Sequence, residues 1–302
     1  MGSGRFPWDR VSQKTLIKSG DGIYDLWFRQ VGWPEFGVGS RVCSNETKFC
    51  IVFHTEGLIN DRVIRSLKEF GKEFRDVRPL LTVVPPISPM YQIDPLQNPI
   101  RFEFPFRVTP NSVQLDFKSK IQELSSFFDI GYHGHFFVRT NGTCMPTFDP
   151  SAISSQFAEE YRFLSDMGFR PLAYAGGWWF MAPHMARLLQ SFGFRIDTTL
   201  NDIRMDSFNR RQPYAETPLG RPLRLEGNVI EVPTIRSDAA FFSLIRSKRN
   251  QQRFAILSLH DYNLVVPPLA YSIGKVARRL VRHDRIVGLS ELLSVHASVS
   301  VA

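Results

Sequence analysis

Two kinds of apolar pattern alternate along most of the chain. Lys48–His54 is a short run, rich in β-formers and bounded by polar residues, which predicts a buried strand. Asp61–Phe74 then carries apolar residues at every third or fourth position, the spacing of a helix with one buried face. Asn60 or Asp61 can cap its first turn, because both side chains accept hydrogen bonds from backbone amides. A strand followed by a helix is therefore expected here.

The same alternation continues toward the C-terminus. Further strands are predicted at 79–84, 130–138, 170–175, 229–233 and 253–259. Further helices are predicted at 113–128, 150–167, 183–192 and 272–282, with a last helical turn at 290–294. Pro150 fits the first turn of its helix, and Gly193 fits the position just past the end of the next helix. Repeated strand–helix units favour parallel strands covered by helices, so we expect an α/β fold with a complete or partial (β/α) barrel.

The chain length of 302 residues suits one large domain. Residues 1–46 are irregular and rich in Gly, Trp and Phe, and we expect an N-terminal extension that packs on the body. Residues 47–302 are expected to form the barrel domain. Within it, 85–111 is rich in proline and alternating aromatics, which predicts a long insertion of a kind that is often functional. This insertion could be a lid or a partner surface.

The net charge of +8 favours anionic partners. The basic residues are nevertheless spread along the chain, and the densest cluster, Arg246–Arg253, has no interleaved aromatics. The cluster Lys275–Arg285 has the pattern of a solvated helix face. Nucleic-acid binding is therefore not expected. Acidic, nucleotide-linked or phospholipid-linked sugars would fit the charge equally well.

The chain has no apolar stretch near the roughly 18 residues of a membrane span, so no transmembrane segment is expected. Its N-terminus lacks the apolar core of a signal peptide. The three cysteines show no CxxC spacing and leave an odd thiol, which favours a reducing compartment. We therefore expect a cytoplasmic protein, with a removed leader as the alternative.

Polar side chains end the first and third predicted strands. His54 and Glu56 are two residues apart, and strand side chains alternate between faces, so both should point the same way. An imidazole beside a carboxylate suits metal binding or acid–base catalysis; a solvated glutamate near a helix start is the alternative. His133 and His135 have the same spacing and would make an apt pair of zinc ligands. The alternative for this pair is two polar residues at a strand end.

Two later segments also combine a strand end with unusual side chains. After the strand at 170–175 the chain reads Gly176-Gly-Trp-Trp179, where the glycines permit a sharp turn or a close approach to a ligand. The two tryptophans could be platforms for a sugar or ordinary core residues. The strand at 253–259 ends in His260-Asp261, which places one imidazole at the mouth of a barrel. An isolated histidine means little, so the weight of His260 depends on the other segments.

The order of these segments resembles the polysaccharide deacetylases, carbohydrate esterase family 4. The resemblance covers roughly residues 48 to 294. It rests on an acidic first-strand motif, a Glu-Ile-Gly-x-His motif, a Phe-Arg-x-Gly motif leading to Leu-Gly-Phe-x-x-Asp, a Glu-Val-Pro and a final Leu-x-His. The matching stretches are Phe53–Gly57, Asp129–His133, Ala173–Trp178 with Leu188–Asp197, Glu231–Pro233 and Leu257–Asp261, followed by Ile286–Leu293. The resemblance implies the distorted barrel of that family.

The resemblance also implies roles for individual residues. In the family a divalent metal, with zinc expected here, is held by one acid and two histidines, polarises the acetamide carbonyl and activates a water. By position, Glu56 would be the metal carboxylate and His133 the first metal histidine. His54 would take the place of the catalytic base, and His260 would be the general acid. Nearby aromatic side chains are expected to contact the sugar: Tyr174, Trp178, Trp179 and Tyr262.

Three positions depart from the family pattern. Phe137 occupies the place of the second metal histidine, and His135 is expected to substitute because it shares a strand face with His133. The base position holds His54 in one alignment of the motif and Thr55 in another, and only the histidine could serve as a base. Tyr174 replaces the motif arginine, so a permanent cation is lost there.

These observations leave three functional hypotheses. The first is a metal-dependent deacetylase of an N-acetylated or N-formylated sugar, with Glu56, His133 and His135 as ligands. The second is a degenerate relative that binds a glycan or serves as a partner in surface-polysaccharide synthesis, which Phe137 and Tyr174 motivate. The third is another metal-dependent hydrolase on a (β/α) barrel. The amidohydrolases usually carry His-x-His on their first strand, and this order argues against them. We favour the first.

Overall fold

The structure is a computed structural model. It describes residues 48–56, 58, 61–92, 110–140, 143–201, 205–208, 210–213, 222–225, 228–232, 234–235, 254–265, 267–282 and 286–295. The expected N-terminal extension at 1–46, most of the insertion at 85–111 and the basic cluster at 246–253 lie outside these residues. The predictions for these three segments stay predictions.

The first strand, β1 (Lys48–Thr55), is an interior strand of the sheet. It pairs in parallel with β11 (Phe254–His260) on one side and with β2 (Leu80–Val83) on the other. A parallel strand that is covered on both faces needs apolar residues at nearly every position. Phe49, Ile51 and Phe53 pack toward the helices, whereas Cys50 and Val52 belong to a second apolar cluster on the opposite face. His54 shares the face of Cys50 and Val52, because side chains alternate.

The described strands form one large sheet in the order β10–β11–β1–β2–β3–β6–β7–β9–β8. All neighbours in it are parallel except β8 and β9. The remaining strands are β3 (Asp129–Gly134), β6 (Ala173–Gly176), β7 (Ile196–Asp197), β8 (Leu223–Arg224), β9 (Ile230–Glu231) and β10 (Thr234–Ile235).

The sheet curls back on itself through the segment that follows β7. Asn201 forms a parallel bridge with Thr234 of β10. The Thr234 amide donates to the Leu200 carbonyl at 2.7 Å, and the Thr234 hydroxyl donates to the Thr198 carbonyl at 2.6 Å. The fold is therefore a distorted (β/α) barrel, as the alternation of strands and helices predicts.

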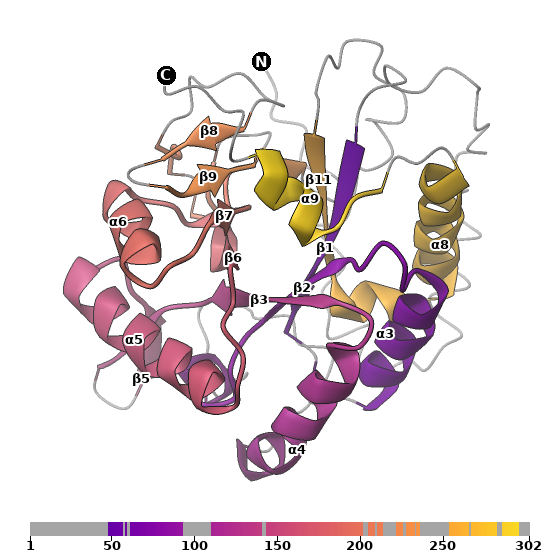
Figure 1. Cartoon of the computed structure of the whole chain (residues 1–302). Helices are drawn as coiled ribbons and strands as arrows, with labels where there is room; N and C mark the ends of the chain where they lie inside the picture. Colours follow the sequence, from indigo (N-terminus) through magenta and orange to yellow (C-terminus); the bar gives the residue numbers. More distant parts are fainter. Residues whose placement is uncertain are drawn as a thin grey trace, which may run out of the picture.

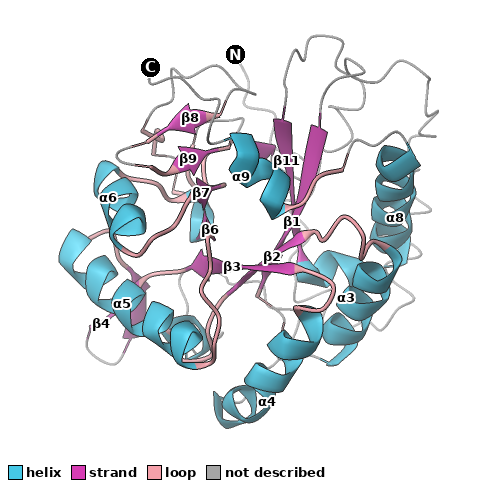
Figure 2. Ribbon diagram, in the orientation of Figure 1, coloured by secondary structure: helices cyan, strands magenta, loops and turns pink. Residues whose placement is uncertain are grey.

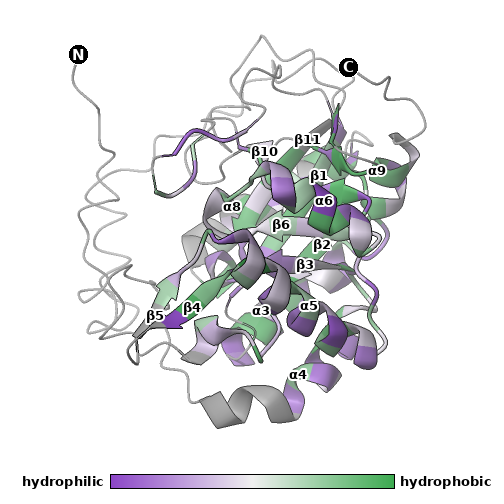
Figure 3. Ribbon diagram, turned by 90° about the vertical axis from the view of Figure 1, so that its left-hand side faces the viewer, coloured by the Kyte–Doolittle hydropathy of each residue, from purple (hydrophilic) through white to green (hydrophobic). Residues whose placement is uncertain are grey.

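Most of the described helices cover the outside of this barrel (Figure 1). Their bounds are α3 (Asp61–Glu73), α4 (Pro110–Leu124), α5 (Pro150–Asp166), α6 (Pro183–Ser191), α8 (Pro267–Arg282) and α9 (Leu289–Val295). Figure 2 shows α3, α4, α5, α6 and α8 arranged around the strands. In Figure 3 the strands are mostly hydrophobic, whereas polar residues colour much of the helices. No described helix is long and apolar enough to cross a membrane.

The helix α9 has a different place, inside the ring of strands in Figure 1. Its residues Leu289 and Leu292 share an apolar cluster with the inward-facing residues of β1. The chain just before it is tied to the strand beginnings, because the Val287 amide donates to the Phe49 carbonyl at 2.8 Å. The Leu289 amide donates to the Asp129 carboxylate at 3.2 Å. This end of the barrel is thus filled, and the other end holds the polar residues.

One predicted strand is wrong, because the structure divides it into two strands. The pattern at 130–138 predicts a single strand, but β3 ends at Gly134 and a separate strand, β4 (Phe137–Thr140), pairs antiparallel with β5 (Thr143–Pro146). The hairpin dipeptide Asn141-Gly142 in the sequence is a signal for such a pair. The chain therefore changes direction between His133 and Phe137, and His135 lies just past the end of β3.

Candidate metal centre

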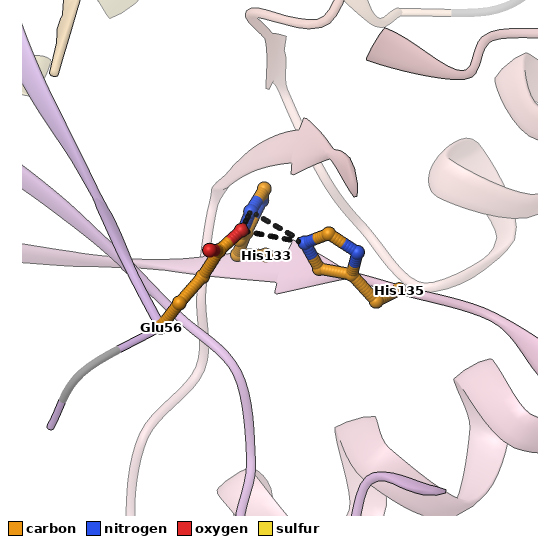
Figure 4. A group of neighbouring side chains, drawn as sticks. All are labelled: Glu56, His133 and His135. Carbon is orange, nitrogen blue, oxygen red and sulfur yellow. Dashed lines mark hydrogen bonds and ion pairs between the residues drawn. The ribbon is translucent and has the colours of Figure 1, made fainter. Parts of the chain in front are cut away.

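Three polar side chains meet where neighbouring strands of the barrel end. Glu56 directly follows β1, His133 lies in β3, and His135 follows β3 by one residue. All three are buried. Because β1, β2 and β3 run in parallel, their C-terminal ends lie at the same end of the barrel. Figure 4 shows the carboxylate and the two rings pointing toward one another.

The ligand atoms lie close enough to share one ion. The Nε2 atom of His135 lies 3.0 Å from Oε1 of Glu56 and 3.0 Å from Nε2 of His133. Oε1 of Glu56 lies 3.5 Å from Nε2 of His133. Tetrahedral zinc with bonds of 2.0–2.1 Å separates its ligand atoms by about 3.3 Å. Among the described residues, these three form the group that can hold a metal ion.

A hydrogen bond from Nδ1 of His133 fixes the orientation of the His133 ring. Nδ1 lies 2.9 Å from the Ala175 carbonyl oxygen on the neighbouring strand β6. A carbonyl only accepts, so Nδ1 carries a hydrogen, which leaves Nε2, on the side of Glu56 and His135, as the atom that can bind an ion. A metal-binding histidine is usually held by such a bond on its other nitrogen. The donor set and this orientation fit a divalent metal.

The charges of the group also suit metal binding. Although burial raises the pKa of Glu56, hydrogen bonds from His133 and His135 hold it well below its usual range. Burial lowers the pKa of His135 to about 4. At neutral pH the group therefore offers an ionised carboxylate and a neutral imidazole, the forms in which these side chains bind metals.

A tight turn after β6 packs closely against the ring of His135. This turn, η3 (Gly177–Trp179), has φ angles of 53° at Trp178 and 59° at Trp179. Large side chains rarely adopt such values, and backbone strain of this kind is often found at functional sites. A Cβ atom on Gly177 would lie 2.4 Å from Nδ1 of His135. Glycine is therefore needed for the ring to lie against the turn.

His54 lies beside the group, inside the barrel. Its ring stacks on His133 with 4.4 Å between centroids, and its Nε2 lies 3.2 Å from the Ser258 hydroxyl oxygen of β11. Burial and the neighbouring His133 and His260 lower the pKa of His54 well below its usual value. The prediction that His54 and Glu56 point the same way agrees with this arrangement. Ser258 was not predicted, although it lies two residues from His260 and therefore on the same strand face.

His260 and Tyr262 lie on the β11 side of the group. The ring of His260 is 5.5 Å from that of His54 and stacks on Tyr262 at 4.9 Å, with 16° between the planes. Tyr262 belongs to η4 (Asp261–Val265), the turn after β11. Both rings are partly exposed, so they lie between the buried group and solvent.

The two tryptophans lie on the opposite side, in η3. Trp178 meets His135 edge-on at 4.7 Å and Phe137 at 5.0 Å, and it is partly exposed. Trp179 is buried and lies 5.7 Å from the ring of His54. The structure therefore brings Trp178 to the group and Trp179 to His54 beside it, with Trp178 the more accessible of the two.

Tyr174 does not lie at the group, and the expectation that it contacts a sugar is not supported. Its side chain is fully buried and packs against Phe157 and Phe194, between the sheet and the helices. The neighbouring Ala175 faces His133 across the strand pair instead. Alternation along β6 thus turns Tyr174 away from the barrel interior.

Comparison with known proteins rests on the structure, because no family model and no curated protein matches the sequence. A protein from Mycobacterium smegmatis assigned as a polysaccharide deacetylase superposes with a TM-score of 0.54 at 15% identity. The match covers 90% of this chain and 94% of that one. The chain has the polysaccharide deacetylase fold.

Other solved structures are also similar to this chain. A glycoside hydrolase family 57 branching enzyme from Thermococcus kodakaraensis matches with a TM-score of 0.51 at 12% identity, over 82% of this chain and 71% of that one. A carbohydrate esterase family 4 pseudoenzyme from Bacillus anthracis matches with a TM-score of 0.45 at 10% identity, over 84% and 69%. At such identities the likeness concerns the fold, so activity has to be argued from the side chains.

Proposed function

We propose that the chain is a metal-dependent hydrolase that removes the acyl group from an N-acylated sugar. The observation that carries this proposal is the convergence of Glu56, His133 and His135 within 4.8 Å of one another at the strand ends. Zinc is the expected metal, since three nitrogen and oxygen ligands with an open fourth position are typical of catalytic zinc.

The described side chains suggest a division of roles. When bound, the ion would polarise the acyl carbonyl and lower the pKa of a water. His54, which lies against His133, would accept the proton that the water loses as it attacks. His260 lies closer to solvent and would donate a proton to the sugar nitrogen as the amide bond breaks. Free amine and carboxylate are then the products.

The sugar would lie between two aromatic walls. Trp178 forms one wall beside His135, and the stacked pair of His260 and Tyr262 forms the other. Aromatic faces bind the apolar faces of sugar rings, while their polar edges stay hydrated. The net charge of +8 favours an anionic sugar conjugate. The cysteine pattern favours a reaction in the cytoplasm, which fractionation of cells would test.

The first experiment is elemental analysis of protein purified without a histidine tag or chelator. We expect about one divalent metal per chain, and His135→Ala should abolish it while the circular dichroism spectrum stays unchanged. His184→Ala is the matched control, because His184 lies on α6 and contacts Phe180 instead of the group. It should bind metal like the wild type. Acetate release from N-acetylated sugars would then be screened.

In a second candidate function, the protein has the same fold but does not catalyse deacylation. Phe137 occupies the place of a metal histidine in the resemblance, and its ring packs on Trp178. A protein that binds a glycan, or that serves as a partner in surface-polysaccharide synthesis, would need only the aromatic walls. If the wild type holds no metal and takes up none on titration with zinc, the hydrolase is excluded. Saturable glycan binding that Trp178→Ala weakens would then support this second function.

A further inference from the structure

The chain turns sharply between the two histidines of the metal group and β4. At this turn the His135 carbonyl and the Phe137 amide face helix α5, whereas the Phe136 carbonyl between them accepts from the Thr147 amide at 3.0 Å. The side-chain amide of Gln156 on α5 contacts the backbone of residues 135–137 twice. Nε2 donates to the His135 carbonyl at 2.7 Å, and Oε1 accepts from the Phe137 amide at 2.9 Å. One side chain thus makes the two hydrogen bonds that an adjacent strand would otherwise make.

Gln156 is itself held in place by a second buried residue of α5. Its Nε2 also donates to Oε1 of Glu160 at 2.6 Å, four residues along the same helix face. Oε2 of Glu160 accepts from the Tyr132 hydroxyl at 2.7 Å. Tyr132 precedes His133 on β3. The segment that carries both histidines is therefore tied to α5 at each of its ends.

These polar residues lie on a helix face that is otherwise apolar. Ile153, Phe157 and Leu164 on α5 are fully buried, and Gln156 and Glu160 are buried among them. Polar groups cost free energy in such a place unless their hydrogen bonds are made, and a satisfied network holds one geometry. An apolar pair at these positions would leave the His135 carbonyl and the Phe137 amide without these partners. The polar network of Gln156 and Glu160 is therefore best explained by its role in holding the backbone of residues 135–137.

We propose that Gln156 and Glu160 are positioning residues that fix the backbone at 135–137 and thereby aim His135 at the metal. This inference rests on the proposed function. His135 lies past the end of β3, so the sheet does not hold its backbone as it holds that of His133. Residues that orient metal ligands from behind typically change metal affinity by 10–100-fold when they are replaced.

The test is zinc affinity, measured by competition with a chromophoric chelator. Gln156→Met keeps the length of the side chain but removes both contacts, and it should weaken zinc binding by about 10–100-fold. Phe157→Leu is the matched control, since Phe157 is the next residue on α5 and packs on the rings of Tyr132 and Phe136, but its apolar side chain makes no hydrogen bond to the 135–137 backbone. It should lower the melting temperature and leave the zinc dissociation constant unchanged.

A second pair of variants separates hydrogen bonding from charge. Glu160→Gln keeps an acceptor for Gln156 and a partner for Tyr132, so its zinc affinity should stay close to that of the wild type. Glu160→Leu removes both and should weaken zinc binding in the direction of Gln156→Met. Equal zinc affinity in Gln156→Met, Glu160→Leu and the wild type would overturn the inference. So would an equal loss in Gln156→Met and Phe157→Leu.

A measurement without metal keeps this inference distinct from the proposed function. Hydrogen exchange of the Phe137 amide should be at least about tenfold faster in Gln156→Met than in Phe157→Leu, because only the first loses the acceptor of that amide. If the wild type takes up no zinc, the hydrolase fails, while faster exchange still supports the positioning role. Unchanged exchange at Phe137 would overturn it.

Discussion

Gly177 lies where the turn after β6 meets the ring of His135. The nearest atoms to a Cβ placed on Gly177 would be three atoms of that imidazole, at 2.4–2.6 Å. The ring cannot move aside freely, because its Nε2 contacts Glu56 and His133. The absence of a side chain at this one position is therefore part of how the metal group is built.

We predict that Gly177→Ala displaces His135 and weakens zinc binding by more than tenfold. Overpacking of this kind usually costs about 1–3 kcal/mol of stability as well. Gly274→Ala is the comparison, because a Cβ at Gly274 of α8 would meet only the Arg278 guanidinium, at 3.4 Å. That change should leave zinc affinity unchanged and raise stability by up to about 1 kcal/mol. Zinc titration and urea unfolding of both variants would check this, and equal zinc affinity in both would contradict it.

Sequence reasoning found the residues of the group but not what supports them. His133 and His135 could be predicted as a pair because their spacing and the strand periodicity are visible in the sequence. Tyr174 was misplaced, because alternation fixes only that neighbours face opposite ways, and packing decides which face is inside. Gln156 reads as an ordinary polar helix residue. Its two contacts depend on where α5 lies against a turn that the sequence pattern did not predict.

At the scale of elements, α5 begins with a defined cap. The Asp149 carboxylate accepts from the Ala152 amide at 2.8 Å, and Pro150 occupies the first helical position. Both features are those that the start of a helix requires, since its first amides lack partners within the helix. The cap also fixes the register of the helix that carries Gln156 and Glu160.

We predict that Asp149→Ala lowers the free energy of unfolding by about 0.5–2 kcal/mol, because an exposed amide loses its acceptor. Asp149→Ser can make the same bond and should cost much less. Urea unfolding followed by circular dichroism would measure both. Equal stability of the alanine and serine variants would show that the cap contributes nothing.

The longer elements could be predicted from the sequence and the short ones could not. The helix at α3 was found because its apolar residues recur along one face, and β1 and β11 because they are continuous apolar runs. The strands β7, β8, β9 and β10 contain two residues each, too few to show a period. Only β9 was expected, as part of a longer strand at 229–233. The two-residue strands exist because tertiary contacts hold them against their neighbours.

At the scale of the whole molecule, β7 and β9 place two buried carboxyl groups opposite each other. Asp197 and Glu231 are paired in the strand register, and both side chains are fully buried. Burial raises the pKa of Asp197 to about 6. Burial and the neighbouring Asp197 raise the pKa of Glu231 well above its usual value. The pair therefore holds protons to a higher pH than two exposed carboxyl groups would, and the rise in pKa is attributed most directly to Glu231, which burial and the Asp197 charge both affect.

We predict that this pair makes the folded state less stable as the pH rises. Both pKa values are raised relative to the unfolded chain, so the folded protein holds protons that the unfolded chain releases above about pH 4. The stabilisation is complete below that pH and is lost as the pH rises through 6 and beyond. Glu231→Gln keeps the shape without the second acid. The stability of the wild type minus that of Glu231→Gln should fall between pH 4 and 7 in urea unfolding. A constant or rising difference would contradict the assignment.

The pairing of β1 with β11 also determines when the protein can fold during its synthesis. His54 and its contact Ser258 are 204 residues apart. A ribosome adds that many residues in roughly 10 to 40 s, and for this time the edge of β1 that pairs with β11 is open and apolar. Such edges attract other chains. A nascent chain that is released before β11 is made has neither a closed sheet nor Ser258 beside His54.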